Sequence, residues 1–291
     1  MRPKYLFTPD NIKKEIDLYN YGEDLFKNKG FCLIKNFINK DEIEYLRNKS
    51  LSEKTYSIKM PKEGNIYTYF YKNKKNNSDN KINDIGIRIH KLRNSILLQP
   101  NADQHLRSYC WRYGLDPSDE DKLVNHQLNH SYMRLNLQKE SSFFELHYDS
   151  PGEIQAVLFL SKYGKDYEKG GLACVGYDGN EYEIDKNANI GDLVLLNAYV
   201  CKHRVDKIVC SSGQIGRLTF FVPIISESHP MFGKTYYFKE NKFKPYLKTP
   251  NDFHEFKGGK IKQVLIFYLY FIHYVTVLLG RGKPVDIDHQ N

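Results

Sequence analysis

The sequence predicts a mainly β protein with flanking helices, organised as a sandwich or jelly roll. Eight short apolar segments follow one another between residues 131 and 224, and the joints between them carry Gly, Asn or Asp. Strands at this spacing favour a sandwich or jelly roll over a βαβ fold. The predicted strands cover residues 131–138, 143–147, 154–161, 172–176, 181–185, 193–197, 203–208 and 215–224.

Helical signals precede these strands. The triplet TPD at 8–10 offers a capping hydroxyl, a proline at the first helical position and an acid in the first turn. We expect a helix from there to about residue 28, ended by Gly30. A short apolar strand is expected at 31–35.

The next part of the chain alternates between helical and polar stretches. Asn39 is expected to cap a second helix over 40–48. The polar, Tyr-rich stretch 54–83 predicts a variable loop or mobile lid, which either borders the substrate or is a plain surface loop. Mixed apolar periodicity over 87–113 predicts helical segments broken at Pro100.

The length and hydropathy pattern suggest one domain with an appendage. A chain of 291 residues is long enough for a sizeable core. We expect residues 1–255 to form a single jelly-roll domain with N-terminal helices and the loop at 54–83. Residues 256–291 would form a separate apolar C-terminal segment.

The composition indicates a cytoplasmic protein and limits its partners. Lys and Arg number 43 against 35 Asp and Glu, giving a net charge of +8, but the basic residues form no dense run. We therefore expect a solvated basic surface and no nucleic-acid partner. The five scattered Cys argue against a disulfide framework, and the N-terminus shows no secretory apolar region.

Three side chains have the chemistry of a metal site. His147 and Asp149 are two residues apart, so on a strand both would point to the same face. His203, which follows the apolar strand at 193–197, is the expected third ligand. Two His and one carboxylate on one face of a metal leave positions open for other ligands, as in non-haem Fe(II) sites. Catalytic zinc also uses this set.

Arg217 is the second chemical signal. It opens the segment RLTFFVP, fourteen residues after His203, where an Arg would be costly to bury alone. Its planar fork is suited to holding a carboxylate through two hydrogen bonds. Zinc hydrolysis at the three ligands would leave this Arg unexplained.

The segments ELHYDS, EKGGLACVGYDG, NIGDLVLLNA, KHRV and GRLTFFVP together resemble the Fe(II)/2-oxoglutarate-dependent oxygenases. The closest likeness is to prolyl-hydroxylase-like and phytanoyl-CoA-hydroxylase-like enzymes. It covers about residues 130–225, with a looser echo in GFCLIKNFINKDEIEYLR at 30–47. The resemblance implies a double-stranded β-helix (jelly roll) fold.

The resemblance also implies roles for individual residues. His147, Asp149 and His203 would bind Fe(II), and Arg217 would hold the distal carboxylate of 2-oxoglutarate. Thr219 stands where many members of the family have a Ser that touches the same carboxylate.

The strand before His147 carries two further candidates for the co-substrate. Tyr132, Arg134 and Asn136 alternate, so they share a face of that strand. In the family a polar residue of this strand often reaches 2-oxoglutarate. Either Tyr132 or Asn136 does so here, or both are structural.

The implied reaction is hydroxylation of an unactivated C–H, driven by Fe(II), 2-oxoglutarate and O2, with release of succinate and CO2. Two alternatives stay open. One is a jelly-roll binding protein without catalysis, and the other is an iron oxygenase that does not use 2-oxoglutarate. The substrate class would be a small molecule or a lipid-linked compound.

The C-terminal apolar run at 264–279 is the remaining signal. Its sixteen residues would form a helix about 24 Å long, short of the roughly 30 Å hydrocarbon core of a bilayer. It is either a helix buried against the body or a dimer partner, or an interfacial anchor with a basic collar. The anchor would place the protein at the inner face of a membrane.

Vesicle flotation separates these two interpretations. If 264–279 is an anchor, the intact chain floats with anionic liposomes while a chain ending at Gly259 does not, because the apolar face and its basic collar are lost. Equal behaviour of the two chains would contradict the anchor.

Overall fold

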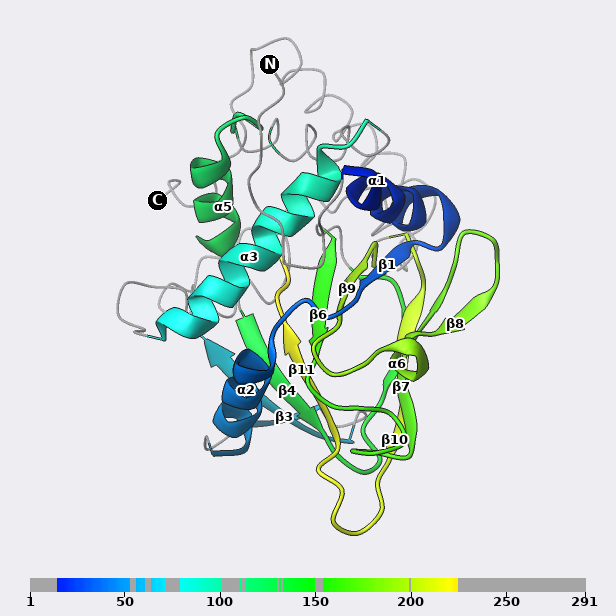
Figure 1. Cartoon of the computed structure of the whole chain (residues 1–291). Helices are drawn as coiled ribbons and strands as arrows, with labels where there is room; N and C mark the ends of the chain where they lie inside the picture. Colours follow the sequence, from blue (N-terminus) through cyan, green and yellow to red (C-terminus); the bar gives the residue numbers. More distant parts are fainter. Residues whose placement is uncertain are drawn as a thin grey trace, which may run out of the picture.

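The computed structural model describes residues 15–52, 56–60, 64–71, 79–100, 110, 114–129, 131, 133–149, 154–198 and 200–224 (Figure 1). The described strands form two antiparallel sheets. The larger has the strand order β1-β9-β6-β11-β4-β3-β2, and the smaller has the order β5-β10-β7-β8. This arrangement confirms the predicted mainly β jelly roll with flanking helices.

The element bounds are as follows. The helices are α1 Glu15–Glu23, the π-helical turn η1 Asp24–Asn28, α2 Lys40–Ser52, α3 Asn80–Leu97, α5 Glu120–Asn129 and α6 Ile184–Asn187. The strands are β1 Phe31–Ile34, β2 Tyr56–Met60, β3 Gly64–Tyr71, β4 Met133–Gln138, β5 Phe144–His147, β6 Gln155–Phe159, β7 Lys169–Val175, β8 Glu181–Glu183, β9 Leu193–Leu196, β10 His203–Val209 and β11 Arg217–Phe221.

Gly30 ends the first helical segment, as predicted. The amides of Lys29 and Gly30 both donate to the carbonyl of Asp24, each over 2.9 Å. Gly30 has a φ of +77°, and a Cβ there would lie 1.8 Å from Sγ of Cys201. Only glycine meets both demands, so the chain can turn directly into β1.

A capping box starts α2. The Asn39 side chain accepts the amide of Glu42 over 2.9 Å, while the Glu42 carboxylate accepts the amide of Asn39 over 3.1 Å. The predicted cap is therefore confirmed. The helix itself continues to Ser52, four residues beyond the predicted end.

The prediction of a loop over 54–83 was wrong for most of its described residues. β2 and β3 pair as an antiparallel hairpin, and β3 continues the larger sheet beside β4. The sequence GNIYTYFY of β3 consists mainly of aromatic and β-branched residues, which favour strands, and the neighbouring Lys and Asn obscured this signal. Asp79 then caps α3, accepting the amide of Ile82 over 3.3 Å, so the helix begins before the predicted residue 87.

The strands from β4 to β11 match the eight predicted segments, with one difference. The segment predicted as a strand over 181–185 ends at Glu183, and α6 follows at once. Helix α5 was not predicted. Among the described residues, no helix is long and apolar enough to cross a bilayer. The segment 256–291 lies outside those residues, so its expected roles stay predictions.

Alternation along β11 divides the larger sheet into two faces. Leu218 and Phe220 join the core cluster formed with Ile85, Ile89 and Leu92 of α3, which crosses this face in Figure 1. Since neighbouring residues of a strand point to opposite faces, Arg217 and Thr219 point toward the smaller sheet.

A second apolar cluster lies between the sheets. Phe159 of β6 and Val194 of β9 pack with Leu172 and Cys174 of β7. The two sheets therefore enclose an interior that is apolar on one side and carries Arg217 and its neighbours on the other. Helix α3 packs on the opposite face of the larger sheet, so it does not fill the space between the two sheets.

Replacing Asn39 by Ala should lower the free energy of unfolding by about 1 kcal/mol, because the first turn of α2 loses its side-chain acceptor. Asn39→Asp keeps that acceptor and should stay near the wild-type value. Urea unfolding followed by circular dichroism measures both. Equal midpoints for Asn39→Ala and the wild type would show that the cap contributes nothing.

Candidate metal centre

Strand pairing brings His147 and His203 together. β10 lies between β5 and β7, and its first residue, His203, is the register partner of both His147 and Cys174. Paired residues of antiparallel strands share a face. Because Cys174 belongs to the cluster between the sheets, both His side chains are placed at the interior face.

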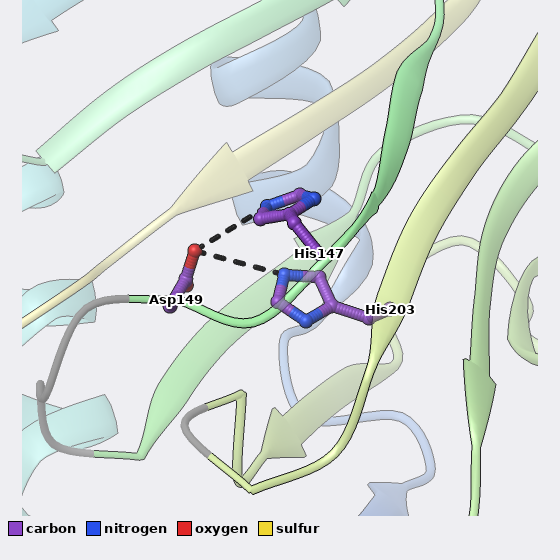
Figure 2. A group of neighbouring side chains, drawn as sticks. All are labelled: His147, Asp149 and His203. Carbon is purple, nitrogen blue, oxygen red and sulfur yellow. Dashed lines mark ion pairs between the residues drawn. The ribbon is translucent and has the colours of Figure 1, made fainter. Parts of the chain in front are cut away.

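Asp149 completes the group from the segment after β5. Its amide donates to the carbonyl of Ala198 over 2.9 Å, which ties this segment to the turn that follows β9. Its Oδ1 lies 3.5 Å from Nε2 of His147 and 3.7 Å from Nε2 of His203 (Figure 2). The candidate ligand atoms of all three residues lie within 4.8 Å of one another.

Backbone hydrogen bonds orient both imidazoles. Nδ1 of His147 lies 2.6 Å from the carbonyl oxygen of Glu145, and Nδ1 of His203 lies 3.2 Å from that of Cys201. A carbonyl can only accept, so each Nδ1 carries a proton, and in the neutral ring this leaves the lone pair on Nε2. Hydrogen bonding of the second ring nitrogen to a carbonyl is typical of metal-binding His.

Burial also favours the neutral form of His203. Only 8% of this residue is exposed. Burial lowers the pKa of its imidazole below the usual value; Asp149 partly offsets this, and His147 adds to it. The side chains of His147 and Asp149 are 38% and 30% exposed, so the group is open to solvent on one side.

The three residues fit a divalent transition metal. Two imidazole nitrogens and one carboxylate oxygen lie within 4.8 Å of one another, and His147 and Asp149 are partly exposed, so the group is open on their side. This is the donor set of a non-haem Fe(II) centre. The structure thus brings together the predicted triad, whose role as iron ligands stays a prediction.

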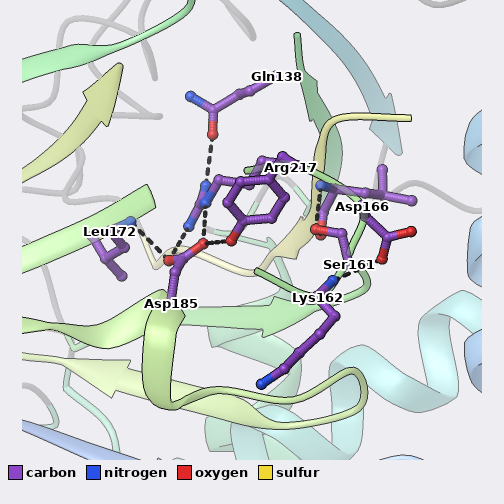
Figure 3. Close-up of polar contacts among 9 residues, drawn as sticks. Gln138, Ser161, Lys162, Asp166, Leu172, Asp185 and Arg217 are labelled. Carbon is purple, nitrogen blue, oxygen red and sulfur yellow. Dashed lines mark hydrogen bonds and ion pairs between the residues drawn. The ribbon is translucent and has the colours of Figure 1, made fainter. Parts of the chain in front are cut away.

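Arg217 is buried between the sheets and already holds a carboxylate. Its Nε donates to Oδ2 of Asp185 over 2.6 Å and its Nη2 to Oδ1 over 3.1 Å. Its Nη1 donates to Oε1 of Gln138 over 2.6 Å. Figure 3 shows the guanidinium between these two side chains. Only 4% of Arg217 is exposed.

Asp185 is held from two further directions. Its Oδ1 accepts the amide of Leu172 over 2.7 Å, and its Oδ2 accepts the hydroxyl of Tyr167. Burial, and then the nearby Asp185 carboxylate, raise the pKa of Tyr167, so this hydroxyl stays a donor. Burial alone would lower the pKa of Arg217, but the ion pair with Asp185 outweighs it and the pKa is raised.

The remaining predicted co-substrate residues lie beside Arg217. Thr219 is 1% exposed and pairs with Asn136 of β4 on the same interior face. Gln138, the register partner of Arg217, continues the alternation of Arg134 and Asn136. Its Nε2 is buried and has no hydrogen-bond partner among the described residues. Tyr132 lies outside the described residues.

Sequence reasoning missed three residues of this interior. Gln138 could have been found, because it continues the alternation that marked Asn136. Tyr167 and Asp185 gave no local signal. Their roles arise from α6 and the turn before β7, which bring distant residues beneath β11.

Strand β7 relates the metal group to the ion pair. His203 is paired with Cys174, and Leu172, whose amide binds Asp185, lies two residues along the same strand. At about 3.3 Å per residue, the positions of Cys174 and Leu172 are roughly 7 Å apart along the strand. The triad and Arg217 thus face the same interior at different depths.

Comparison with known proteins identifies the fold. No family model matches the chain, and neither does any curated protein. A prolyl-4-hydroxylase from Pseudomonas putida is 16% identical, with a TM-score of 0.50, over 71% of this chain and 97% of its own. A prolyl hydroxylase from Trichoplax adhaerens, solved with a peptide of hypoxia inducible factor, is 12% identical, with a TM-score of 0.52, over 77% and 96%. The chain therefore shares its jelly-roll fold, the double-stranded β-helix, with these two prolyl hydroxylases.

Proposed function

We propose that this protein is an Fe(II)- and 2-oxoglutarate-dependent oxygenase that hydroxylates an unactivated C–H of a small-molecule or lipid-linked substrate. The convergence of Nε2 of His147, Nε2 of His203 and Oδ1 of Asp149 carries the proposal. These atoms lie on the fold that the prolyl hydroxylases share.

The chain's own residues prepare the site for a metal. The carbonyls of Glu145 and Cys201 fix the Nδ1 protons, so no ligand has to change tautomer when a metal binds. Asp149 supplies the one negative charge of the ligand set. The open side next to His147 and Asp149 is where further ligands and the substrate would enter.

Arg217 and its neighbours would hold the second component. Arg217 offers the guanidinium and Thr219 the hydroxyl for a distal carboxylate, and Asn136 lies beside Thr219 on β4. When bound, Fe(II) and 2-oxoglutarate would activate O2, so that one oxygen atom enters succinate, the other enters the substrate, and CO2 is released. The apolar cluster around Phe159 and Leu172 would keep water from this interior.

One observation favours a second candidate. Arg217 is paired with Asp185 rather than left open toward the interior. An iron oxygenase that does not use 2-oxoglutarate would need no free Arg at this point. Saturating binding of 2-oxoglutarate to the iron-loaded protein would remove this candidate.

Replacing Asp149 by Ala should weaken Fe(II) binding by at least about 100-fold and abolish succinate formation, because the only anionic ligand of the triad is lost. Iron retained after anaerobic gel filtration and succinate released in air measure the two effects. Asp121→Ala, an exposed carboxylate on α5, is the matched control and should keep both properties. Wild-type turnover in Asp149→Ala would remove the triad assignment.

Thr219→Val should weaken 2-oxoglutarate binding by about two- to fivefold, the effect of losing one hydrogen bond, and leave Fe(II) binding unchanged. Thr219→Ser keeps the hydroxyl and should bind like the wild type. Anaerobic titration calorimetry on the iron-loaded variants measures the affinities. Identical affinities for Thr219→Val and the wild type would show that the hydroxyl does not touch the co-substrate.

A further inference from the structure

The ion pair with Asp185 uses the part of Arg217 that is best suited to a carboxylate. Nε and Nη2 form one edge of the guanidinium, and both oxygens of Asp185 lie on it, at 2.6 and 3.1 Å. This is the two-bond geometry in which Arg holds a carboxylate most strongly. Nη1 is bound to Gln138. An incoming carboxylate meets a guanidinium that is already paired.

Asp185 is built into this position. The amide of Leu172 and the hydroxyl of Tyr167 donate to the same two oxygens that face Arg217. The backbone of Gly171 passes so close that a Cβ there would lie 2.6 Å from both Cβ and Cγ of Asp185, and its φ is +116°. Glycine at 171 therefore makes room for the Asp185 side chain.

The pairing changes the charge that a co-substrate would meet. Arg217 alone would present one positive charge between the sheets, but Arg217 and Asp185 together are neutral. Both are almost fully buried, with side chains 5% and 2% exposed. Burying a second carboxylate beside a neutral pair is costly, since its charge is not compensated.

The side-chain amide of Gln138 is a hydrogen-bond donor beside Arg217 that a charged or an uncharged ligand could use. Nε2 of Gln138 is buried without a hydrogen-bond partner in the described part of the chain, while Oε1 of the same amide is bound to Arg217. Such unpaired donors are rare in protein interiors. The distal end of the site thus combines a neutralised Arg with an amide donor.

We propose that Asp185 is an internal competitor of the distal carboxylate of 2-oxoglutarate for Arg217. The inference rests on the proposed function. Its consequence is low selectivity: the protein binds a 2-oxo acid without a distal carboxylate nearly as well as 2-oxoglutarate. Asp185 thereby reduces the preference for 2-oxoglutarate over other 2-oxo acids.

The other role for Asp185 would be to position Arg217 for 2-oxoglutarate. The two roles predict opposite effects of Asp185→Asn, which removes the charge and nearly preserves the shape. A competitor, when neutralised, leaves Arg217 for 2-oxoglutarate and strengthens its binding. A positioning residue, when neutralised, lets Arg217 lose its orientation and weakens that binding.

Titration calorimetry on the Mn(II)-loaded protein distinguishes them without turnover. The two ligands are 2-oxoglutarate and 2-oxopentanoate, which has the same five-carbon chain but no distal carboxylate. We expect the wild type to prefer 2-oxoglutarate by less than about fivefold, and Asp185→Asn to bind it at least about tenfold tighter with little change for 2-oxopentanoate. Asp192→Asn, another buried ion-paired carboxylate, is the control and should keep the wild-type ratio.

The remaining outcomes contradict either the competitor role of Asp185 or the proposed function. A wild-type preference for 2-oxoglutarate above about fivefold, or unchanged or weaker binding in Asp185→Asn, would contradict the competitor role. If Asp185→Asn does not fold, the wild-type ratio alone decides. If neither acid binds the metal-loaded protein, the proposed function fails, and the role of Asp185 as a competitor fails with it.

Discussion

The register of β10 between β5 and β7 is the constraint on which the site depends. It places His203 opposite both His147 and Cys174, so two imidazoles share one face of the smaller sheet. Because side chains alternate along a strand, a slip by one residue would turn His203 to the other face. The carbonyls of Glu145 and Cys201 then only have to orient rings that the register has already brought together.

The larger sheet places Arg217 and Thr219 in the space between the sheets, because side chains also alternate along β11. Leu218 and Phe220 of β11 pack toward the helices, so Arg217 and Thr219 must face the smaller sheet. A buried Arg is tolerated only when it is paired and hydrogen-bonded, and Asp185 fulfils both conditions. Removing one partner of such a pair typically costs about 3–5 kcal/mol, so Asp185 links the stability of the sandwich to the position of Arg217.

Much of this arrangement could be predicted from the sequence, because it rests on local signals. The strands of 131–224, the cap at Asn39 and the grouping of His147 with His203 follow from alternation, turn residues and spacing. The hairpin of β2 and β3 was missed, since Lys and Asn around its aromatic residues indicated a loop. The partner of Arg217 could not be predicted, because the Arg217–Asp185 contact joins β11 to α6, a helix that begins where a strand was expected.

We propose that His147, Asp149 and His203 hold an iron ion which binds a 2-oxo acid. The most direct test is the visible spectrum of the metal-free wild-type protein under anaerobic conditions, recorded after addition of Fe(II) and then of 2-oxoglutarate to saturation. We expect the charge-transfer band of a 2-oxo acid chelated to Fe(II). Iron binding without that band, or no iron binding, would contradict the proposal.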